Sequence, residues 1–171
     1  GIENLATAIS EVRRISRDLR PGVLDDLGLG PAIKTLVEEF EARTGISCVF
    51  ETVVFRNRLD NEAKIALYRI AQEALTNVER HAKATQVEIG LRGHRRGATL
   101  RISDNGKGIR DDKGATGLGL RNMQERMEQL GGVLDISHGR GIGTTIEARV
   151  PLSHMLPPED TNADTRKVAA E

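Results

Sequence analysis

The chain has 171 residues, 38% of them hydrophobic, which is enough apolar material for one principal domain but hardly for two. Lysine and arginine number 25 and aspartate and glutamate number 25, so the net charge is zero and no global field attracts nucleic acid or an anionic membrane. Three phenylalanines, one tyrosine and no tryptophan leave out the stacking platforms of single-strand nucleic-acid binders. We therefore expect no nucleic-acid partner, and any phosphate binding must be local.

The first twenty residues have the pattern of a helix with one apolar seam. Within residues 3–19 the apolar side chains recur in steps of three and four, at Leu5, Ala8, Val12, Ile15 and Leu19. Pro21 ends this helix because proline cannot continue the hydrogen-bond ladder, and a linker follows to about residue 30. The sequence opens at Gly1 inside the helical pattern, which predicts a fragment of a longer protein.

The sequence holds neither a signal peptide nor a run of roughly 18 apolar residues. Its single cysteine, Cys48, excludes an internal disulfide and a cysteine-based metal site, and it fits a reducing compartment. We expect this domain to be cytoplasmic, with any membrane anchor of the full-length protein in parts outside the chain.

Helix and strand patterns alternate from residue 31 onward. Helical patterns cover 31–43, 61–82 and 118–130, and strand patterns cover 46–55, 86–91, 99–103, 133–137 and 144–150. Pro31 is well placed as an early helical residue, Gly45 as a helix stop, and Asp60 or Asn61 as the start of the longest helix. This order predicts an α+β domain with helices on one face of a mixed sheet. We expect residues 153–171 to form a disordered polar tail.

On the longest helix, Glu73, Asn77 and His81 recur every four residues and form one polar stripe beside the apolar face. The amide oxygen of Asn77 suits Mg²⁺, a hard cation that bridges substrate phosphates. Glu73, one turn earlier, could order or polarise a water or an incoming nucleophile. Spacing alone favours the simpler interpretation, an ordinary solvated helix face, and the helix dipole explains His81.

The run Asp104-Asn105-Gly106-Lys107-Gly108 follows directly from a strand pattern, so the Asp104 carboxylate is expected at a strand end. A carboxylate there accepts a hydrogen bond from the exocyclic amine of adenine but faces the acceptor oxygen of guanine, which predicts ATP over GTP. Gly106 and Gly108 would let the backbone approach a flat base. The alternative is a simple tight turn, because Asp-Asn-Gly is also good turn chemistry.

Glycines also precede the next helix and the last strand. Gly117, Leu118 and Gly119 open a helix, where unpaired amides and the positive end of the dipole favour phosphate. The surrounding sequence matches neither the P-loop nor the dinucleotide-binding fingerprint. In segment 141–145, the hydroxyl of Thr145 could bond a base or a bridging water. A plain loop with a cap and an ordinary glycine turn are the alternatives.

Taken in order, four motifs resemble the N, G1, G2 and G3 boxes of the histidine kinase, gyrase, Hsp90 and MutL superfamily of ATP-binding domains. They are YRIAQEALTNVERHAKA (68–84), DNGKG (104–108), GLGLRNM (117–123) and GTT (143–145). DLRPGVLDDLGLGPAI (18–33) resembles the end of the dimerisation segment and the linker of histidine kinases related to nitrate sensors and the thermosensor DesK. The resemblance covers residue 3 to about residue 152.

By implication the fold is the Bergerat two-layer α/β sandwich, with an N-terminal helix from a dimerisation bundle. The implied domains are the end of a dimerisation helix (1–20), a linker (21–30), the ATP-binding catalytic domain (31–152) and the tail (153–171).

The matching motifs imply a role for each candidate residue. Asn77 coordinates Mg²⁺ on the ATP phosphates, Glu73 is the general base or polarising acid, and Asp104 binds the adenine amine. The remaining nucleotide-binding positions are Gly106, Gly108, Gly117, Leu118, Gly119 and Thr145, with residues 109–117 as a short ATP lid.

The implied reaction is transfer of the ATP γ-phosphoryl group to a histidine imidazole, followed by its passage to an aspartate of a response regulator. The full-length protein is expected to be a homodimer. The acceptor histidine of this subfamily precedes the LRP segment, and none of the four histidines here matches it, namely His81, His94, His138 and His154. We therefore expect the chain to hold ATP but not to phosphorylate itself.

Two other functions fit parts of the pattern. One is a nucleotide-dependent regulatory module of the same superfamily, such as an anti-sigma-factor serine kinase switch, which would not need a preceding dimerisation helix. The other is a degenerate nucleotide sensor without transfer activity. The presence of Glu73, Asn77 and Asp104 together argues against such decay.

Overall fold

The computed structural model describes residues 5, 8, 24, 28–53, 58–108, 117–139 and 141–157. Three expected features lie largely or wholly outside these residues: the N-terminal helix and linker, the lid before residue 117, and the tail beyond residue 157. Among the helices within these ranges, none is long and apolar enough to cross a membrane.

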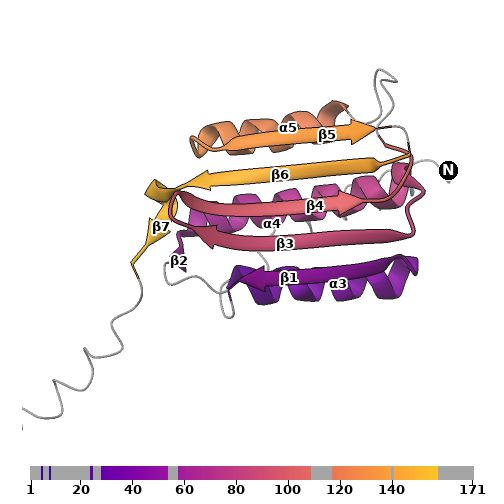
Figure 1. Cartoon of the computed structure of the whole chain (residues 1–171), viewed down its shortest axis with the longest axis horizontal. Coiled ribbons are helices and arrows are strands. Elements are labelled where there is room, and N and C mark those ends of the chain that lie inside the picture. Colours follow the sequence, from indigo (N-terminus) through magenta and orange to yellow (C-terminus); the bar gives the residue numbers. More distant parts are fainter. Residues whose placement is uncertain are drawn as a thin grey trace, which may run out of the picture.

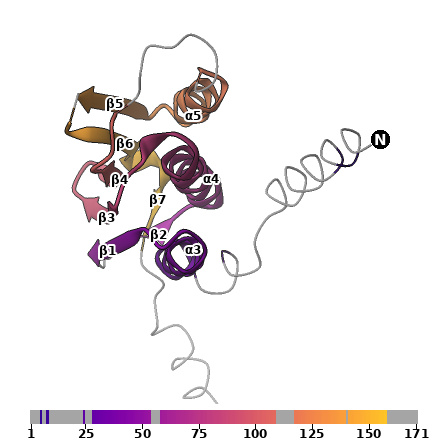
Figure 2. The ribbon, with the colours of Figure 1, turned by 90° about the vertical axis from the view of Figure 1, so that its right-hand side faces the viewer.

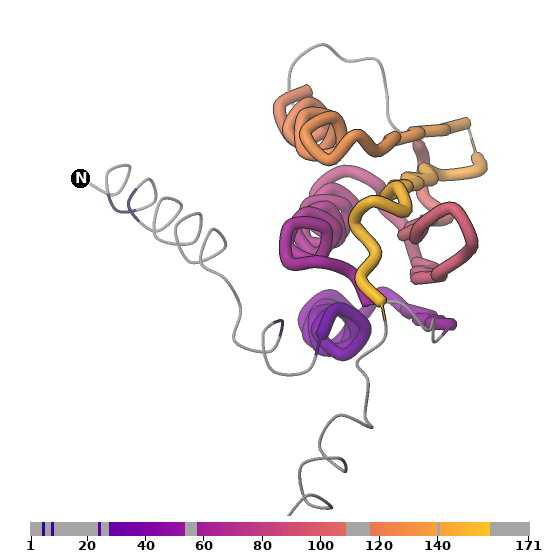
Figure 3. The backbone as a smooth tube through the Cα atoms, turned by 90° about the vertical axis from the view of Figure 1, so that its left-hand side faces the viewer, coloured from indigo at the N-terminus to yellow at the C-terminus, as the bar shows by residue number. Residues whose placement is uncertain are grey.

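The described chain forms two layers, a five-stranded sheet and three long helices on one of its faces (Figures 1, 2 and 3). The helices and strands, in chain order, are α3 (Leu29–Thr44), β1 (Ser47–Val53), β2 (Arg58–Leu59), α4 (Asn61–Asn77), η1 (Val78–Ala82), β3 (Gln86–His94), β4 (Gly97–Asp104), α5 (Gly117–Gln129), β5 (Val133–Gly139), β6 (Gly143–Pro151), η2 (Leu152–His154) and β7 (Met155–Leu156). The predicted α+β architecture, with helices on one face of a mixed sheet, is confirmed.

The strand order in the large sheet is β1-β3-β4-β6-β5. β1 runs parallel to β3, because α4 lies between them in the sequence and returns the chain to the end of the sheet at which β1 begins. The other neighbours pair antiparallel, and β3 and β4 form the predicted hairpin. Both strands are longer than their apolar patterns, since the ladder extends to His94 opposite Gly97.

The core lies between the sheet and the helices. Alternate residues of the strands point into it, such as Val87, Ile89 and Leu91 of β3, which are at most 2% exposed. The apolar side of α4 meets them with Leu67 and Ile70, both fully buried. The intervening residues of each strand face away from the helices. The second face of the sheet therefore carries most of the polar side chains of the strands.

Two of the helix ends follow the predicted signals. Asp60 is the N-cap of α4, and its Oδ1 accepts a hydrogen bond from the amide of Ala63 at 2.9 Å. Gly45 ends α3 in the left-handed conformation with φ of 72°. The last turn of the long helix differs from the prediction, because residues 78–82 form a π-helix, η1, in place of α-helix.

The start of the predicted tail was wrong. Residues 152–154 form the short helix η2, and β7 pairs antiparallel with β2 in a second, two-stranded sheet. His154 donates hydrogen bonds through Nδ1 to Asp60 Oδ2 at 2.7 Å and through Nε2 to the carbonyl of Leu130 at 2.9 Å. These contacts hold the segment after β6 against the N-terminal end of α4 and the residue that follows α5.

Candidate functional site

Asp104 is the last residue of β4 and is only 7% exposed. Its neighbours along the strand alternate between the core and the open face, and Asp104 lies on the side of the helices with Ile102. The amide of Gly106 donates to its Oδ1 at 2.8 Å. A buried carboxylate is costly unless its oxygens find donors, so this hydrogen bond fixes the side chain and leaves Oδ2 for a further donor.

The turn after Asp104 is bonded to the chain that leaves η1. Asn105 Oδ1 accepts hydrogen bonds from the amides of Thr85 at 2.9 Å and Gln86 at 3.0 Å. Its Nδ2 donates to the hydroxyl of Thr85 at 2.9 Å. Asn105 therefore has a structural role, which joins the end of β4 to the segment that begins β3.

Gly106 and Lys107 pack against the last residue of the π-helix. The amide of Lys107 donates to the carbonyl of Ala82 at 2.8 Å. A Cβ placed on Gly106 would lie 2.2 Å from the same carbonyl oxygen, so only glycine permits this approach. The glycine that sequence reasoning assigned to base binding is thus also required by the contact between the turn and η1.

Two further glycines bring the start of β6 close to Asp104. Gly143 has φ of 81°, and a Cβ placed on it would lie 1.9 Å from the carbonyl oxygen of Asp104. Gly108 has φ of 78° and faces the backbone of Gly139 and Gly143. Glycines of two segments, Gly106 and Gly108 in the turn and Gly143 at the start of β6, therefore allow close backbone packing beside one buried carboxylate.

The polar stripe lies on α4 and η1, and η1 ends at Ala82, whose carbonyl contacts the turn after Asp104. Glu73, Asn77 and His81 are all half-buried, and Asn77 is the residue at which α4 changes into the π-helix. Within the described residues, neither Glu73 nor Asn77 makes a side-chain hydrogen bond or ion pair with another residue. π-Turns inside helices occur often at functional sites because they re-aim side chains.

The N-terminus of α5 lies beside this stripe. Gly117, Leu118 and Gly119 form its first turn, and the side chain of Leu118 is 72% exposed. The carboxylate of Glu73 lies directly against Gly119, since a Cβ placed there would be 2.1 Å from Glu73 Oε1. The structure thus brings the first turn of α5 against Glu73 of the α4 stripe.

Thr145 is not placed with these residues. Its hydroxyl lies 2.7 Å from that of Ser103, its partner on β4, on the face of the sheet away from the helices. Thr144, one residue earlier, is 8% exposed, and Thr144 and Asp104 are the two buried polar side chains of the described chain. The alternation of Ile146, Ala148 and Val150 would have assigned Thr144 to the inner face.

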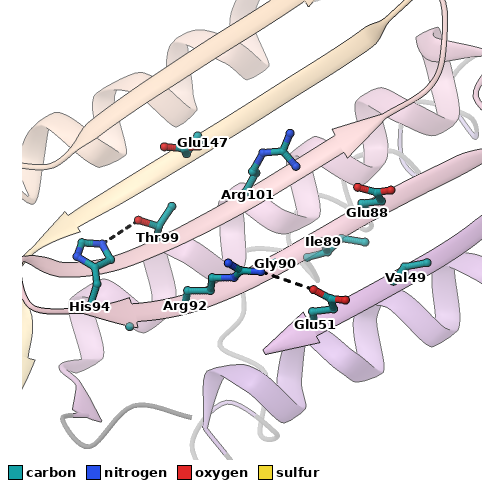
Figure 4. Close-up of a pocket in the computed structure, with 11 residues that line it drawn as sticks. Val49, Glu51, Glu88, Ile89, Gly90, Arg92, His94, Thr99, Arg101 and Glu147 are labelled. Carbon is teal, nitrogen blue, oxygen red and sulfur yellow. Dashed lines mark hydrogen bonds and ion pairs between the residues drawn. The ribbon is translucent and has the colours of Figure 1, made fainter. Parts of the chain in front are cut away.

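The open face of the sheet also has a hollow, which Figure 4 shows, and its charged lining is typical of a solvated surface. Glu51 and Arg92 form an exposed ion pair at 3.7 Å across it, and His94 shares a hydrogen bond with Thr99 at 3.0 Å. None of the predicted site residues lines this hollow. The candidate site is therefore the opposite region, between the helices and the ends of β4 and β6.

The single cysteine is not a candidate nucleophile. Cys48 lies on the edge strand β1 in register with Val87, which in turn pairs with Asp104 on β4. Partial burial, with a smaller contribution from the charge of Glu41, raises the pKa of its thiol to about 11. The thiol is therefore protonated at neutral pH and is a poor nucleophile.

The functional groups of the site are of the kinds that a nucleoside triphosphate requires. Asp104 offers an acceptor at the buried end, beside the closely packed glycine backbone of Gly106, Gly108 and Gly143. Asn77 and Glu73 offer oxygen atoms nearer the start of α5, whose free amides favour phosphate. An adenine amine, a hard cation and a triphosphate would each find a group of the required kind.

Comparison with known proteins agrees with this chemistry. The sensor histidine kinase MctS of Rhizobium johnstonii is 48% identical over 161 residues, which are 92% of this chain and 35% of that protein. The signal transduction histidine-protein kinase/phosphatase DegS of Brevibacillus brevis is 40% identical over 148 residues, which are 86% of this chain and 38% of that protein. The chain thus spans little more than a third of these relatives.

Among solved structures, the histidine kinase domain of the Erythrobacter litoralis EL346 blue-light activated histidine kinase has the same fold. It superposes with a TM-score of 0.59 at 23% identity, over 73% of this chain and 61% of that one. Residues 62–154, just over half of the chain, match the family described as histidine kinase-, DNA gyrase B- and HSP90-like ATPase. This match begins on α4, ends at η2 and encloses Glu73, Asn77, Asp104 and the start of α5. The chain therefore belongs to that family, and the matched residues are the family's ATP-binding domain.

Proposed function

We propose that the chain is the catalytic domain of a sensor histidine kinase, which transfers the γ-phosphoryl group of ATP to a histidine. The observation that carries the proposal is the buried Asp104 carboxylate, with one oxygen bonded to Gly106 and glycine backbone around it. The relatives named above support this choice over an anti-sigma-factor serine kinase switch, because both are histidine kinases by name.

Asp104 would select the base. Its Oδ2 would accept a hydrogen bond from the exocyclic amine of adenine, while the keto oxygen of guanine would leave the buried carboxylate facing another acceptor. Thr144, buried on the inner face next to Gly143, is better placed than Thr145 to contribute a hydroxyl to the base. Gly106 and Gly108 would line the base with backbone.

Asn77 and Glu73 would act on the phosphate side. Asn77 would hold Mg²⁺ through its amide oxygen, and the cation would supply positive charge to the phosphates. The backbone at Gly117, Leu118 and Gly119 would contact phosphate oxygens at the helix N-terminus. Glu73, which lies against this turn, would orient the acceptor imidazole or take up its proton.

In the transfer itself, a nitrogen of the acceptor imidazole forms the new N–P bond while the bond from the γ-phosphorus to the bridging oxygen breaks, and ADP leaves. The protein contributes mainly position and charge stabilisation in such a step. The acceptor would come from a dimerisation domain of the homodimeric full-length protein, and a response-regulator aspartate would then receive the phosphoryl group.

The test is calorimetric titration with a non-hydrolysable ATP analogue and Mg²⁺, with GTP as the control nucleotide. We expect the native chain to bind the ATP analogue and not GTP, and Asp104→Asn to weaken binding by about 100-fold, the value of a lost hydrogen bond to a buried charge. The asparagine keeps an oxygen for Gly106 but turns its amide donors toward the adenine amine. Equal affinity of the native and Asp104→Asn chains would refute the assigned base site.

Transfer is measured by adding ATP and a separately supplied dimerisation domain that contains an acceptor histidine. Acid-labile phosphate on that domain is the expected product. Binding without such transfer would leave an ATP-binding module that is not a kinase, and acid-stable phosphate on serine would favour the switch protein instead.

A further inference from the structure

Glu73 and Gly119 come from different helices and fit together closely. A Cβ placed on Gly119 would lie 2.1 Å from Glu73 Oε1, 3.0 Å from its Cδ and 3.4 Å from its Cγ. Non-bonded atoms do not approach so closely, so the Glu73 carboxylate occupies the volume that a side chain at position 119 would need. α4 and α5 lie next to each other along this contact (Figure 2).

The backbone of Gly119 does not itself require glycine. Gly119 has no positive φ, unlike Gly108 and Gly143. Alanine within a helix is more favourable than glycine by about 1 kcal/mol, so helix formation would favour a different residue here. At Gly117, two residues earlier, an added Cβ would meet nothing within 4 Å. The feature that distinguishes position 119 is the side chain of Glu73.

The charge of Glu73 suits the place it occupies. The first turn of α5 has no acidic residue of its own. The positive end of a helix dipole favours a negative charge in its first turn, and Glu73 supplies one from the neighbouring helix. Within the described chain the Glu73 side chain has no hydrogen bond or ion pair that would hold it elsewhere. The space at Gly119 and the field of α5 together determine where this carboxylate lies.

We infer that Gly119 is a positioning residue, whose missing side chain sets the place of the Glu73 carboxylate. The inference rests on the proposed function, in which Glu73 acts on the acceptor imidazole. The obstructing atoms belong to the end of a flexible side chain, so Gly119→Ala should displace the carboxylate and leave the fold intact. A catalytic group that moves by about 1 Å can lose about 100-fold in rate.

The experiment compares Gly119→Ala, Glu73→Ala and the double variant with the native chain. Affinity for the ATP analogue with Mg²⁺ is measured by calorimetry, and the rate of transfer to a supplied acceptor domain is measured at saturating ATP. We expect Gly119→Ala to lower the rate by about 30- to 100-fold and to keep the analogue affinity within about twofold. The double variant should be no slower than Glu73→Ala, because nothing is left to position.

A shorter side chain provides the rescue. Glu73→Asp withdraws the carboxylate by one methylene, so combining it with Gly119→Ala should restore part of the rate that Gly119→Ala loses. Gly30→Ala is the matched control, since it also lies in the first turn of a helix and its Cβ would meet only Thr52 Oγ1 at 3.9 Å. This control should leave both affinity and rate unchanged.

Two results would overturn the inference. One is a loss of analogue affinity in Gly119→Ala as large as its loss of rate, and the other is additive loss in the double variant, since both indicate a phosphate contact alone. The Glu73 carboxyl carbon resonance, followed by NMR, reports the position without any activity. This resonance should shift in Gly119→Ala and not in Gly30→Ala. If the native chain transfers no phosphate, the proposed function is refuted, but the resonance still tests the contact between Glu73 and Gly119.

Discussion

The two ends of α4 carry polar side chains of the same kinds and use them differently. At the N-terminal end, both oxygens of Asp60 have partners within the protein, Oδ1 with the amide of Ala63 at 2.9 Å and Oδ2 with His154 Nδ1 at 2.7 Å. At the C-terminal end, Glu73 and Asn77 have no side-chain partner of that kind among the described residues.

This difference separates structure from function in one helix. Polar groups that satisfy each other stabilise the fold, whereas half-buried polar groups without internal partners are available to a ligand. If the distinction is correct, changes at Asp60 should affect stability and not nucleotide affinity, and changes at Asn77 should do the reverse.

In the comparison of the two ends of α4, the largest expected effect is at Asp60. Asp60→Ala removes the helix cap, worth about 1 kcal/mol, and the carboxylate partner of His154, worth up to about 1 kcal/mol. We expect the free energy of unfolding to fall by about 2 kcal/mol, measured by urea denaturation. The affinity for the ATP analogue, measured below the unfolding transition, should stay within about twofold of the native value.

Asp60→Asn is the matched control, because it keeps a cap oxygen for Ala63 and removes only the charge. It should lose less stability than Asp60→Ala. A loss of nucleotide affinity in either variant comparable with the loss of stability would show that the two ends of α4 are coupled, and the comparison would fail.

The next effect in size is at Asn77. Asn77→Ala should weaken binding of the ATP analogue about tenfold in the presence of Mg²⁺, because the cation loses one oxygen ligand. With EDTA in place of Mg²⁺, the native chain and the variant should bind alike. Stability should be unchanged or slightly higher, since alanine has the greater helix propensity and no internal hydrogen bond is lost.

Thr76→Ala tests whether the effect belongs to Asn77. Thr76 is the preceding residue on α4, and its hydroxyl donates to the carbonyl of Gln72 at 2.9 Å. It should therefore leave the Mg²⁺ dependence of binding unchanged. A weakening of Asn77→Ala that persists in EDTA would mean that Asn77 contacts the nucleotide and not the cation.

Much of this helix could be predicted from the sequence because its signals are local. The cap at Asp60 and the stripe at Glu73 and Asn77 follow from spacing within a few turns, and Asp104 follows directly from a strand. The base-site role predicted for Thr145 came from motif matching alone, whereas the alternating residues of β6 place Thr144 on the inner face and Thr145 on the outer one. Motif matching identified the segment, but it did not identify which of the two adjacent threonines faces the helices.

Other features depend on contacts between distant segments, which no local pattern records. β2 and β7 have two residues each, too few to show a period, and they pair across almost a hundred residues. The contact of Glu73 with Gly119 likewise joins two helices, and sequence reasoning assigned Gly119 only to phosphate. These features could be found only once the helices and strands were placed in three dimensions.

The smallest expected effect is the pH dependence at the structural end of α4. The His154 side chain is 15% exposed, and its burial disfavours the charged ring. The hydrogen bond and charge of Asp60, the carbonyl of Leu130 and the charge of Glu62 outweigh burial and raise its pKa above 6.5. The folded state therefore binds this proton more tightly than the unfolded state does.

The sign of the effect follows from that preference. The contribution of His154 is complete below pH 6.5, the unfolded value, and is lost as the pH rises through the higher folded pKa. We expect about 0.5–1 kcal/mol between pH 6 and pH 8.5, measured by urea denaturation. His154→Gln should remove this dependence while His94→Gln, at an exposed turn, should keep it. Equal slopes in all three chains would mean that the proton on His154 contributes nothing to the fold.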